Sequence, residues 1–111
     1  MKLWLDDIRN PKHHEDWEDA VWVNTPEEAI EYLETGKVTH LSLDNDLGLF
    51  EDDEGRPRDG YAVAKWLERR VYEDDSFVPP NVLNAHTANS VAHRKMWACF
   101  KAIRLEVARR G

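Results

Sequence analysis

The stretch Leu3-Trp4-Leu5-Asp6-Asp7 is the most informative part of the chain for the fold, because it places two carboxylates directly after a short apolar run. Three similar runs follow along the chain: Val21-Trp22-Val23, Leu41-Ser42-Leu43 and Val82-Leu83. Short runs that are apolar on both faces are typical of strands in parallel sheets, which are covered on both sides. The sequence therefore predicts four parallel strands.

Helical patterns alternate with these runs. Three helices are expected: one capped by Thr25 and ended by Gly36, one that opens at Asp59-Gly60 and ends before Pro79-Pro80, and one over about residues 89–109. Residues 9–20 lack a clear pattern and predict a loop or one short helix, whereas residues 48–58 predict a mobile loop. The alternation is typical of one α/β domain that spans residues 1–111.

Composition excludes several classes of protein. The chain has 111 residues and a net charge of −7, and its five tryptophans supply large apolar side chains for a core, which argues against disorder. Cys99 is the only cysteine, which excludes an internal disulfide and a thiolate zinc site. No apolar run reaches the ~20 residues that a membrane helix needs, and the N-terminal run is too short for a signal peptide. We expect a cytoplasmic protein with no membrane partner.

Acidic residues stand directly after two of the predicted strands. Asp6 and Asp7 follow the first run, and Asp44 follows the third. Ligands of open parallel sheets bind at the carboxyl ends of the strands, so these carboxylates meet there if the two strands are neighbours. Clustered carboxylates repel unless a cation or proton intervenes, and hard oxygen ligands favour Mg²⁺ or Mn²⁺. We predict a metal site of Asp6, Asp7 and Asp44, supported by Asp46; the alternative is that these are turn and cap residues of an acidic chain.

The segment that joins the last strand to the last helix is His86-Thr87-Ala88-Asn89-Ser90. Asn89 or Ser90 is a good N-cap, and capping alone would account for the pattern. The functional interpretation adds a helix N-terminus, the hydroxyl of Thr87 and the amide of Asn89, a combination that suits phosphate. His86 is then a candidate general acid or base.

Basic residues gather at the end of the chain. From Asn89 onward six basic residues stand against one acid, Glu106, so this part carries +5 and the preceding part −12. Arg94 lies in the first turns of the expected helix, where the helix dipole does not favour a cation, and is a candidate phosphate ligand. A basic helix offers a surface for a partner protein or for RNA phosphates. The overall acidic charge argues against nonspecific binding of nucleic acid and against duplex DNA as a partner.

Several of these blocks together resemble a known family. The acidic pair, Leu43-Asp44 and Thr87-Ala88 look like the acidic pair, phosphoacceptor aspartate and hydroxyl residue of a response-regulator receiver domain, in the same chain order. More closely, four blocks resemble the receiver-like family named for cyclic-phosphate processing: residues 4–11, 41–48, 59–61 and 86–89. The resemblance implies a single truncated receiver-like domain with a three-layer, flavodoxin-like α/β fold and a sheet in the order 2-1-3-4. A receiver's fifth strand, lysine and last helix have no counterpart within residues 1–111.

The resemblance and the residues together predict an enzyme. The expected activity is that of a Mg²⁺-dependent phosphoesterase acting on the phosphate of a nucleotide or an RNA end, for which a 2′,3′-cyclic phosphate is one candidate. Asp44 and His86 are the expected catalytic residues, and Thr87, Asn89 and Arg94 the expected phosphate ligands. One alternative is a degenerate receiver that accepts a phosphoryl group on Asp44 and signals through a partner. Another is a noncatalytic module that binds a partner through Lys101 and Arg104.

Overall fold

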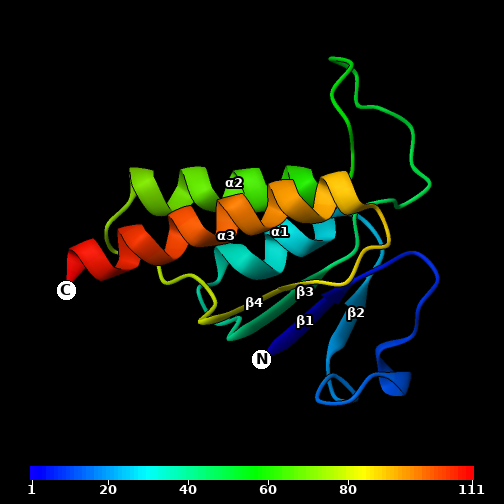
Figure 1. Cartoon of the computed structure of the whole chain (residues 1–111), viewed down its shortest axis with the longest axis horizontal. Helices are drawn as coiled ribbons and strands as arrows, with labels where there is room; N and C mark the ends of the chain where they lie inside the picture. Colours follow the sequence, from blue (N-terminus) through cyan, green and yellow to red (C-terminus); the bar gives the residue numbers. More distant parts are fainter.

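The computed structural model describes residues 1–111, which form one parallel sheet with helices. The strands are β1 (Lys2–Leu5), β2 (Val21–Val23), β3 (His40–Leu43) and β4 (Val82–Ala85). Their order across the sheet is β2-β1-β3-β4, with every neighbouring pair parallel (Figure 1). The predicted order is confirmed. Because β1 and β3 are neighbours, the carboxylates that follow them begin at the same edge of the sheet.

The three expected helices are also confirmed. They are α1 (Pro26–Glu34), α2 (Gly60–Glu73) and α3 (Ser90–Arg110), and the β1–β2 connection contributes only one short 3₁₀ helix, η1 (Pro11–His13). Each α-helix begins at a side chain whose oxygen accepts a hydrogen bond from a backbone N–H of the first turn: Thr25 for α1, Asp59 for α2 and Asn89 for α3. None of these helices combines the length and the apolar character that crossing a membrane requires.

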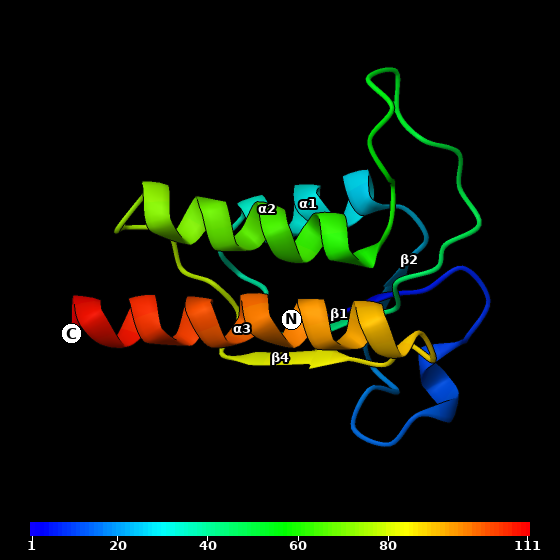
Figure 2. The same cartoon turned by 45° about the horizontal axis from the view of Figure 1, so that its top comes forward.

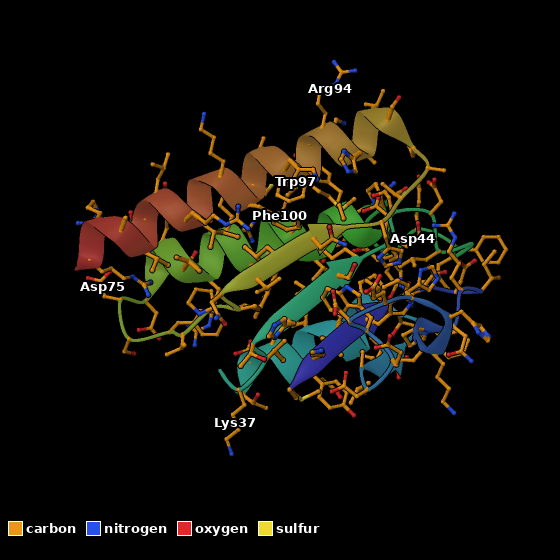
Figure 3. The ribbon with its side chains drawn as sticks, turned by 60° about the horizontal axis from the view of Figure 1, so that its bottom comes forward. Lys37, Asp44, Asp75, Arg94, Trp97 and Phe100 are labelled. Carbon is orange, nitrogen blue, oxygen red and sulfur yellow. The ribbon has the colours of Figure 1, made fainter.

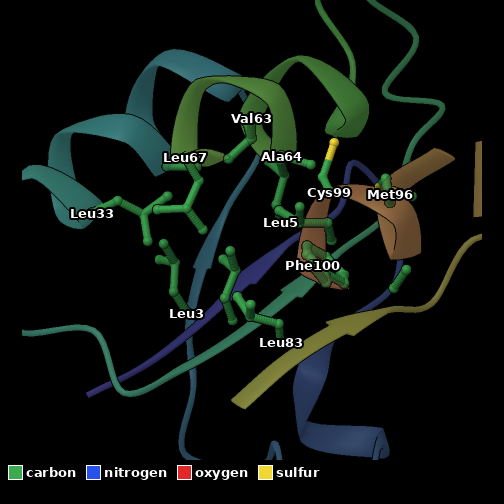
Figure 4. Close-up of a cluster of buried hydrophobic side chains, with 14 of the residues drawn as sticks. Leu3, Leu5, Leu33, Val63, Ala64, Leu67, Leu83, Met96, Cys99 and Phe100 are labelled. Atoms are coloured by element: carbon green, nitrogen blue, oxygen red, sulfur yellow. The ribbon is translucent and has the colours of Figure 1, made fainter. Parts of the chain in front are cut away.

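All three α-helices pack on one face of the sheet (Figures 1 and 2). The register aligns Leu3, Leu41 and Leu83 across β1, β3 and β4, and their side chains join those of the helices in one core (Figure 4). Side chains of a strand alternate between its faces, so the residues one position later point away from this core. The layering is therefore asymmetric, with α-helices on one face only.

The opposite face of the sheet carries Trp4, Ser42 and Asn84, which are partners in register. It is covered by the β1–β2 connection, from which Trp17 packs near Trp4 with ring centroids 5.8 Å apart. Trp4 is 1% exposed although it lies outside the main core. The third layer is thus an irregular segment, as the lack of apolar periodicity in residues 9–20 predicts.

Helix α2 begins in direct contact with the end of β3. The Gly60 N–H donates to the carbonyl of Asn45 at 3.1 Å, and the Tyr61 N–H donates to the Asn45 side-chain oxygen at 3.0 Å. A Cβ at Gly60 would lie 2.0 Å from the Asp44 carbonyl oxygen, so only glycine permits this approach. The start of α2 therefore fixes the backbone that carries Asp44.

Candidate metal and phosphate site

Three carboxylates converge at the edge of the sheet where β1 and β3 end. Asp6, Asp7 and Asp44 each offer an oxygen, and these oxygens lie within 4.8 Å of one another. Asp6 is fully buried and Asp44 is 8% exposed. Such a set of hard oxygen donors could hold a divalent cation. Strands β1 and β3, which are distant in the chain, thus place the three aspartates close together, as we expected.

The electrostatics of the cluster differ between the two buried aspartates. Burial and the negative charge of Asp6 together raise the pKa of Asp44 from 3.8 to about 6, while the guanidinium of Arg9 acts in the opposite direction. Burial also acts to raise the pKa of Asp6, but hydrogen bonds from the backbone N–H groups of Ile8 and Arg9 and from His86 outweigh it and lower that pKa. Asp6 is therefore the stable anion, and Asp44 is the carboxylate that a proton or a cation would neutralise.

His86 joins this cluster through a chain of hydrogen bonds. Its Nε2 lies 3.0 Å from Asp6 Oδ2, and its Nδ1 lies 2.6 Å from the Ser42 hydroxyl oxygen. The Asn84 amide donates to that same hydroxyl oxygen at 2.9 Å. Burial lowers the pKa of His86 to about 4, so the ring is neutral at pH 7. Ionised Asp6 can only accept hydrogen bonds, so the His86 ring donates one to Asp6 from Nε2. Its Nδ1 accepts a hydrogen bond from the Ser42 hydroxyl.

This bonding changes the interpretation of His86. Both ring nitrogens are engaged within the protein, and the side chain is only 12% exposed. The proton transfer expected of His86 requires a ring nitrogen that reaches the substrate, and the hydrogen bonds leave none free. The arrangement favours a positioning role, in which His86 fixes the orientation of the Asp6 carboxylate.

Tryptophans support the same edge of the sheet. The indole of Trp4 stacks on His86 and donates from Nε1 to the carbonyl of Arg9 at 2.9 Å. The indole of Trp22 donates to the carbonyl of Asp6 at 2.8 Å, and the Asn24 amide donates to the same oxygen at 3.2 Å. The backbone of Asp6 is thus held from β2 and from the residue that follows β2, and the loop after the acidic pair is held from β1.

The predicted phosphate ligands Thr87 and Asn89 follow the end of β4 at this edge. The Thr87 hydroxyl oxygen accepts from the Asn89 N–H at 3.1 Å, and the Asn89 side-chain oxygen accepts from the Ala92 N–H at 3.0 Å, which caps α3. In both hydrogen bonds the side chain of Thr87 or Asn89 acts only as the acceptor. The hydroxyl proton of Thr87 and the side-chain NH₂ of Asn89 have no partner within the protein, so both remain available as donors to an anion.

Two predicted site residues lie apart from the cluster. The Arg94 side chain is exposed and points away from the sheet and from Asp44 (Figure 3), because its position in the second turn of α3 faces solvent. Asp46 is also exposed, and its side chain accepts only a hydrogen bond from Asn45 at 3.3 Å. In this arrangement Arg94 does not face the cluster with the other predicted phosphate ligands, and Asp46 is not among the three converging carboxylates.

A different arginine supplies positive charge to the site. Arg9 donates from Nη1 to the carbonyl of His86 at 2.7 Å, which holds its guanidinium beside the cluster. Its position two residues after the acidic pair is the only sequence signal for this role. Ser42 and Asn84 were also missed, although both are polar residues within apolar strands. The period of two along a strand, applied to these residues and Trp4, would have placed all three on one face.

Comparison with known proteins adds one finding. The family model described as a cyclic-phosphate processing receiver domain matches residues 1–102. Neither a curated protein nor a solved structure matches the chain.

Proposed function

The chain belongs to the family of cyclic-phosphate processing receiver domains, and we propose that it is a Mg²⁺-dependent phosphoesterase that acts on the phosphate of a nucleotide or an RNA end. The observation that carries the proposal is the convergence of Asp6, Asp7 and Asp44 within 4.8 Å. A 2′,3′-cyclic phosphate is the first substrate to test, because the family description names cyclic phosphates as the class of compound processed.

The residues present fit a divalent cation. All three donors are carboxylate oxygens. Burial and the negative charge of Asp6 raise the pKa of Asp44, and a cation would offset both by supplying a positive partner for the buried carboxylate. Asp6, Asp7 and Asp44 would hold Mg²⁺, with Mn²⁺ as a substitute of similar ligand preference. The cation, when bound, supplies positive charge that stabilises the oxygens of the phosphate during attack.

The remaining groups bind and orient the substrate. The Thr87 hydroxyl and the Asn89 NH₂ can donate hydrogen bonds to phosphoryl oxygens, because neither donates within the protein. The Arg9 guanidinium adds positive charge. Asp44 has two carboxylate oxygens, so one can hold the cation while the other accepts a proton from the attacking water. The same carboxyl group can then return that proton to the leaving oxygen. His86 positions Asp6.

Hydrolysis assays test this proposal. Cyclic and linear nucleotides are incubated with Mg²⁺ and wild-type protein, Asp44→Asn or Asp46→Asn. We expect a rate at least about 10²-fold lower for Asp44→Asn, since it loses both an anionic ligand and the proton acceptor. Asp46→Asn is the matched control, because its carboxylate lies outside the cluster. Equal rates for wild type and Asp44→Asn would end the proposal.

A phosphoacceptor role for Asp44 is the second candidate. It is favoured by the position of this aspartate directly after a central strand of a receiver-family domain. A small acyl-phosphate donor followed by intact-mass measurement separates the two functions. A stable phosphoryl adduct that is absent from Asp44→Asn, without turnover of any nucleotide, favours the phosphoacceptor.

A further inference from the structure

Helices α2 and α3 carry an unusual set of basic side chains for a chain with a net charge of −7. Nine of the fifteen basic residues lie on these helices, and three of the six that lie elsewhere, Lys2, Arg56 and Arg58, form ion pairs with carboxylates. Six exposed basic residues on these two helices form none: Lys65, Arg69, Arg94, Lys95, Lys101 and Arg104. The buried Glu106 of α3 pairs with Arg109 and does not offset them. The two helices therefore present a positive surface on an acidic protein.

Part of this surface is a groove between the two helices. The groove has a volume of about 380 Å³ and is lined by Tyr61, Lys65, Glu68, Arg69, Tyr72 and Cys99. From α2, the Lys65 ammonium lies 5.5 Å from the centre of the Tyr61 ring, and from α3 the Lys95 ammonium lies 5.3 Å from the same centre. The two lysines are thus gathered at one ring. Tyr72 is 53% exposed, so it offers an aromatic surface in the same groove.

The groove begins next to the carboxylate cluster. The backbone N–H of Tyr61 donates to the side chain of Asn45, the residue after Asp44. The first turns of α2 and α3 lie at the same end of the molecule (Figure 2), and α3 begins directly after Thr87 and Asn89. A polymer whose terminal phosphate lies at the carboxylates can therefore continue over Tyr61 into the groove.

We propose that the α2–α3 groove binds single-stranded RNA upstream of a terminal phosphate held at the carboxylate cluster. Unpaired lysines and arginines bind successive phosphates, and aromatic rings stack on bases, which together are the means by which proteins bind single strands. This combination favours a nucleic acid over an acidic peptide, because an acidic peptide has no bases to stack on Tyr72. The negative net charge of the chain does not oppose it, since the acids lie largely outside α2 and α3.

The inference rests on the proposed function in two respects, which are the terminal phosphate at the carboxylate cluster and the choice of RNA over DNA. A 2′,3′-cyclic phosphate forms only where a 2′-hydroxyl is present. The positive groove itself is independent of the reaction, so binding and hydrolysis can fail separately.

Fluorescence anisotropy with a labelled 12-nucleotide RNA tests the groove. The protein carries Asp44→Asn, so that no turnover interferes, and this background is compared with the same protein carrying Lys65→Ala and Lys95→Ala. Each phosphate contact with a single strand adds about 0.7 to the steepness with which log affinity falls against log salt concentration. We expect loss of the two lysines to make this dependence less steep by about 1.4, which corresponds to about 25-fold weaker binding at 0.1 M salt.

A charge-matched control uses Lys12→Ala and Lys37→Ala, which remove two exposed lysines outside α2 and α3. Figure 3 shows Lys37 at the end of the sheet opposite Asp44. We expect this pair to lower affinity less than threefold. Equal losses for the two pairs would overturn the proposal, because binding would then depend only on net charge.

Two further probes identify the ligand class. Tyr72→Ala should weaken RNA binding while leaving inorganic polyphosphate binding unchanged, and Tyr72→Phe should retain RNA binding. RNA should compete better than DNA of the same sequence and better than polyglutamate. Polyglutamate competing as well as RNA would overturn the proposal in favour of an acidic protein partner. RNA binding without hydrolysis of any nucleotide would support the groove and reject the proposed function, whereas hydrolysis of mononucleotides without RNA binding would do the reverse.

Discussion

The imidazole of His86 lies flat against the indole of Trp4, with the ring centroids 3.8 Å apart and the ring planes 9° from parallel. The stacked indole shields one face of the imidazole from water, which contributes to the burial that keeps the ring neutral. His86 in turn holds Asp6 through Nε2. A tryptophan on the helix-free face of the sheet thus determines how a carboxylate at its edge is presented.

Replacement of His86 should weaken metal binding. In His86→Ala the Asp6 carboxylate loses the donor that orients one of its oxygens, and loss of such a supporting hydrogen bond typically costs 10–100-fold in metal affinity. Titration calorimetry with Mg²⁺ or Mn²⁺ measures the change. His13→Ala, an exposed position in η1, is the control and should bind as wild type does. An unchanged affinity in His86→Ala would refute the positioning role.

Replacement of Asp44 should stabilise the fold at neutral pH. The folded-state pKa of Asp44 is raised from 3.8 to about 6, so the folded protein holds a proton more tightly than the unfolded chain does. The contribution of Asp44 to stability is therefore fully present below about pH 4 and is lost as the pH rises through about 6, where the loss amounts to about 3 kcal/mol. Without metal, Asp44→Asn should be more stable than wild type by up to about 3 kcal/mol at pH 7.5 and by much less at pH 4.5.

Urea denaturation at the two pH values measures this difference. The pKa of His86 is lowered to about 4, so its contribution has the opposite sign and rises with pH between about 4 and 6.5. That contribution is shared by wild type and Asp44→Asn as long as the His86–Asp6 contact persists, so the comparison isolates Asp44. Asp44→Asn being less stable than wild type at pH 7.5 would contradict the description of Asp44 as a repelled, buried carboxylate.

Removal of the Ser42 hydroxyl should destabilise the protein without touching the carboxylates directly. Ser42 is fully buried, and in Ser42→Ala the His86 Nδ1 and the Asn84 amide both lose their partner. A buried polar group without a partner costs about 1–3 kcal/mol. Chemical denaturation should show a loss of this size, against less than about 0.5 kcal/mol for the exposed Ser90→Ala. Equal effects would mean that the hydrogen-bond chain contributes little to stability.

A methyl group at Gly60 should disturb both stability and the site. The new Cβ would lie 2.0 Å from the Asp44 carbonyl oxygen, so α2 and the end of β3 must separate. We expect a loss of about 1–3 kcal/mol on unfolding together with weaker Mn²⁺ binding. Gly111→Ala is the comparison, because its Cβ would have no neighbour closer than 3.9 Å. Wild-type metal affinity in Gly60→Ala would show that the position of Asp44 does not depend on this contact.

The main features of the fold could be predicted from local sequence signals. Thr25 and Asp59 are cap residues, and short apolar runs mark the strands, so the elements follow from chemistry near each residue. The strand order came from the family resemblance, since nothing local determines which strands pair. Placement of all helices on one face also depends on tertiary packing, which the sequence patterns did not specify.

The candidate site shows the same division. The convergence of Asp6, Asp7 and Asp44 could be predicted because the acidic pair directly follows β1 and Asp44 directly follows β3. Side-chain direction could not, and for this reason the position of Arg94 near the start of α3 does not reveal that its side chain points away from Asp44. Arg9 and Ser42 act through hydrogen bonds to a residue far away in the sequence, His86, which no spacing argument could identify.

Anomalous diffraction of crystals soaked in Mn²⁺ tests the metal site most directly. We expect one strong peak bonded to carboxylate oxygens of Asp6, Asp7 and Asp44, and no such peak in crystals of Asp44→Asn. A map with no peak among these three residues, at a concentration of Mn²⁺ that saturates ordinary carboxylate sites, would contradict the metal site.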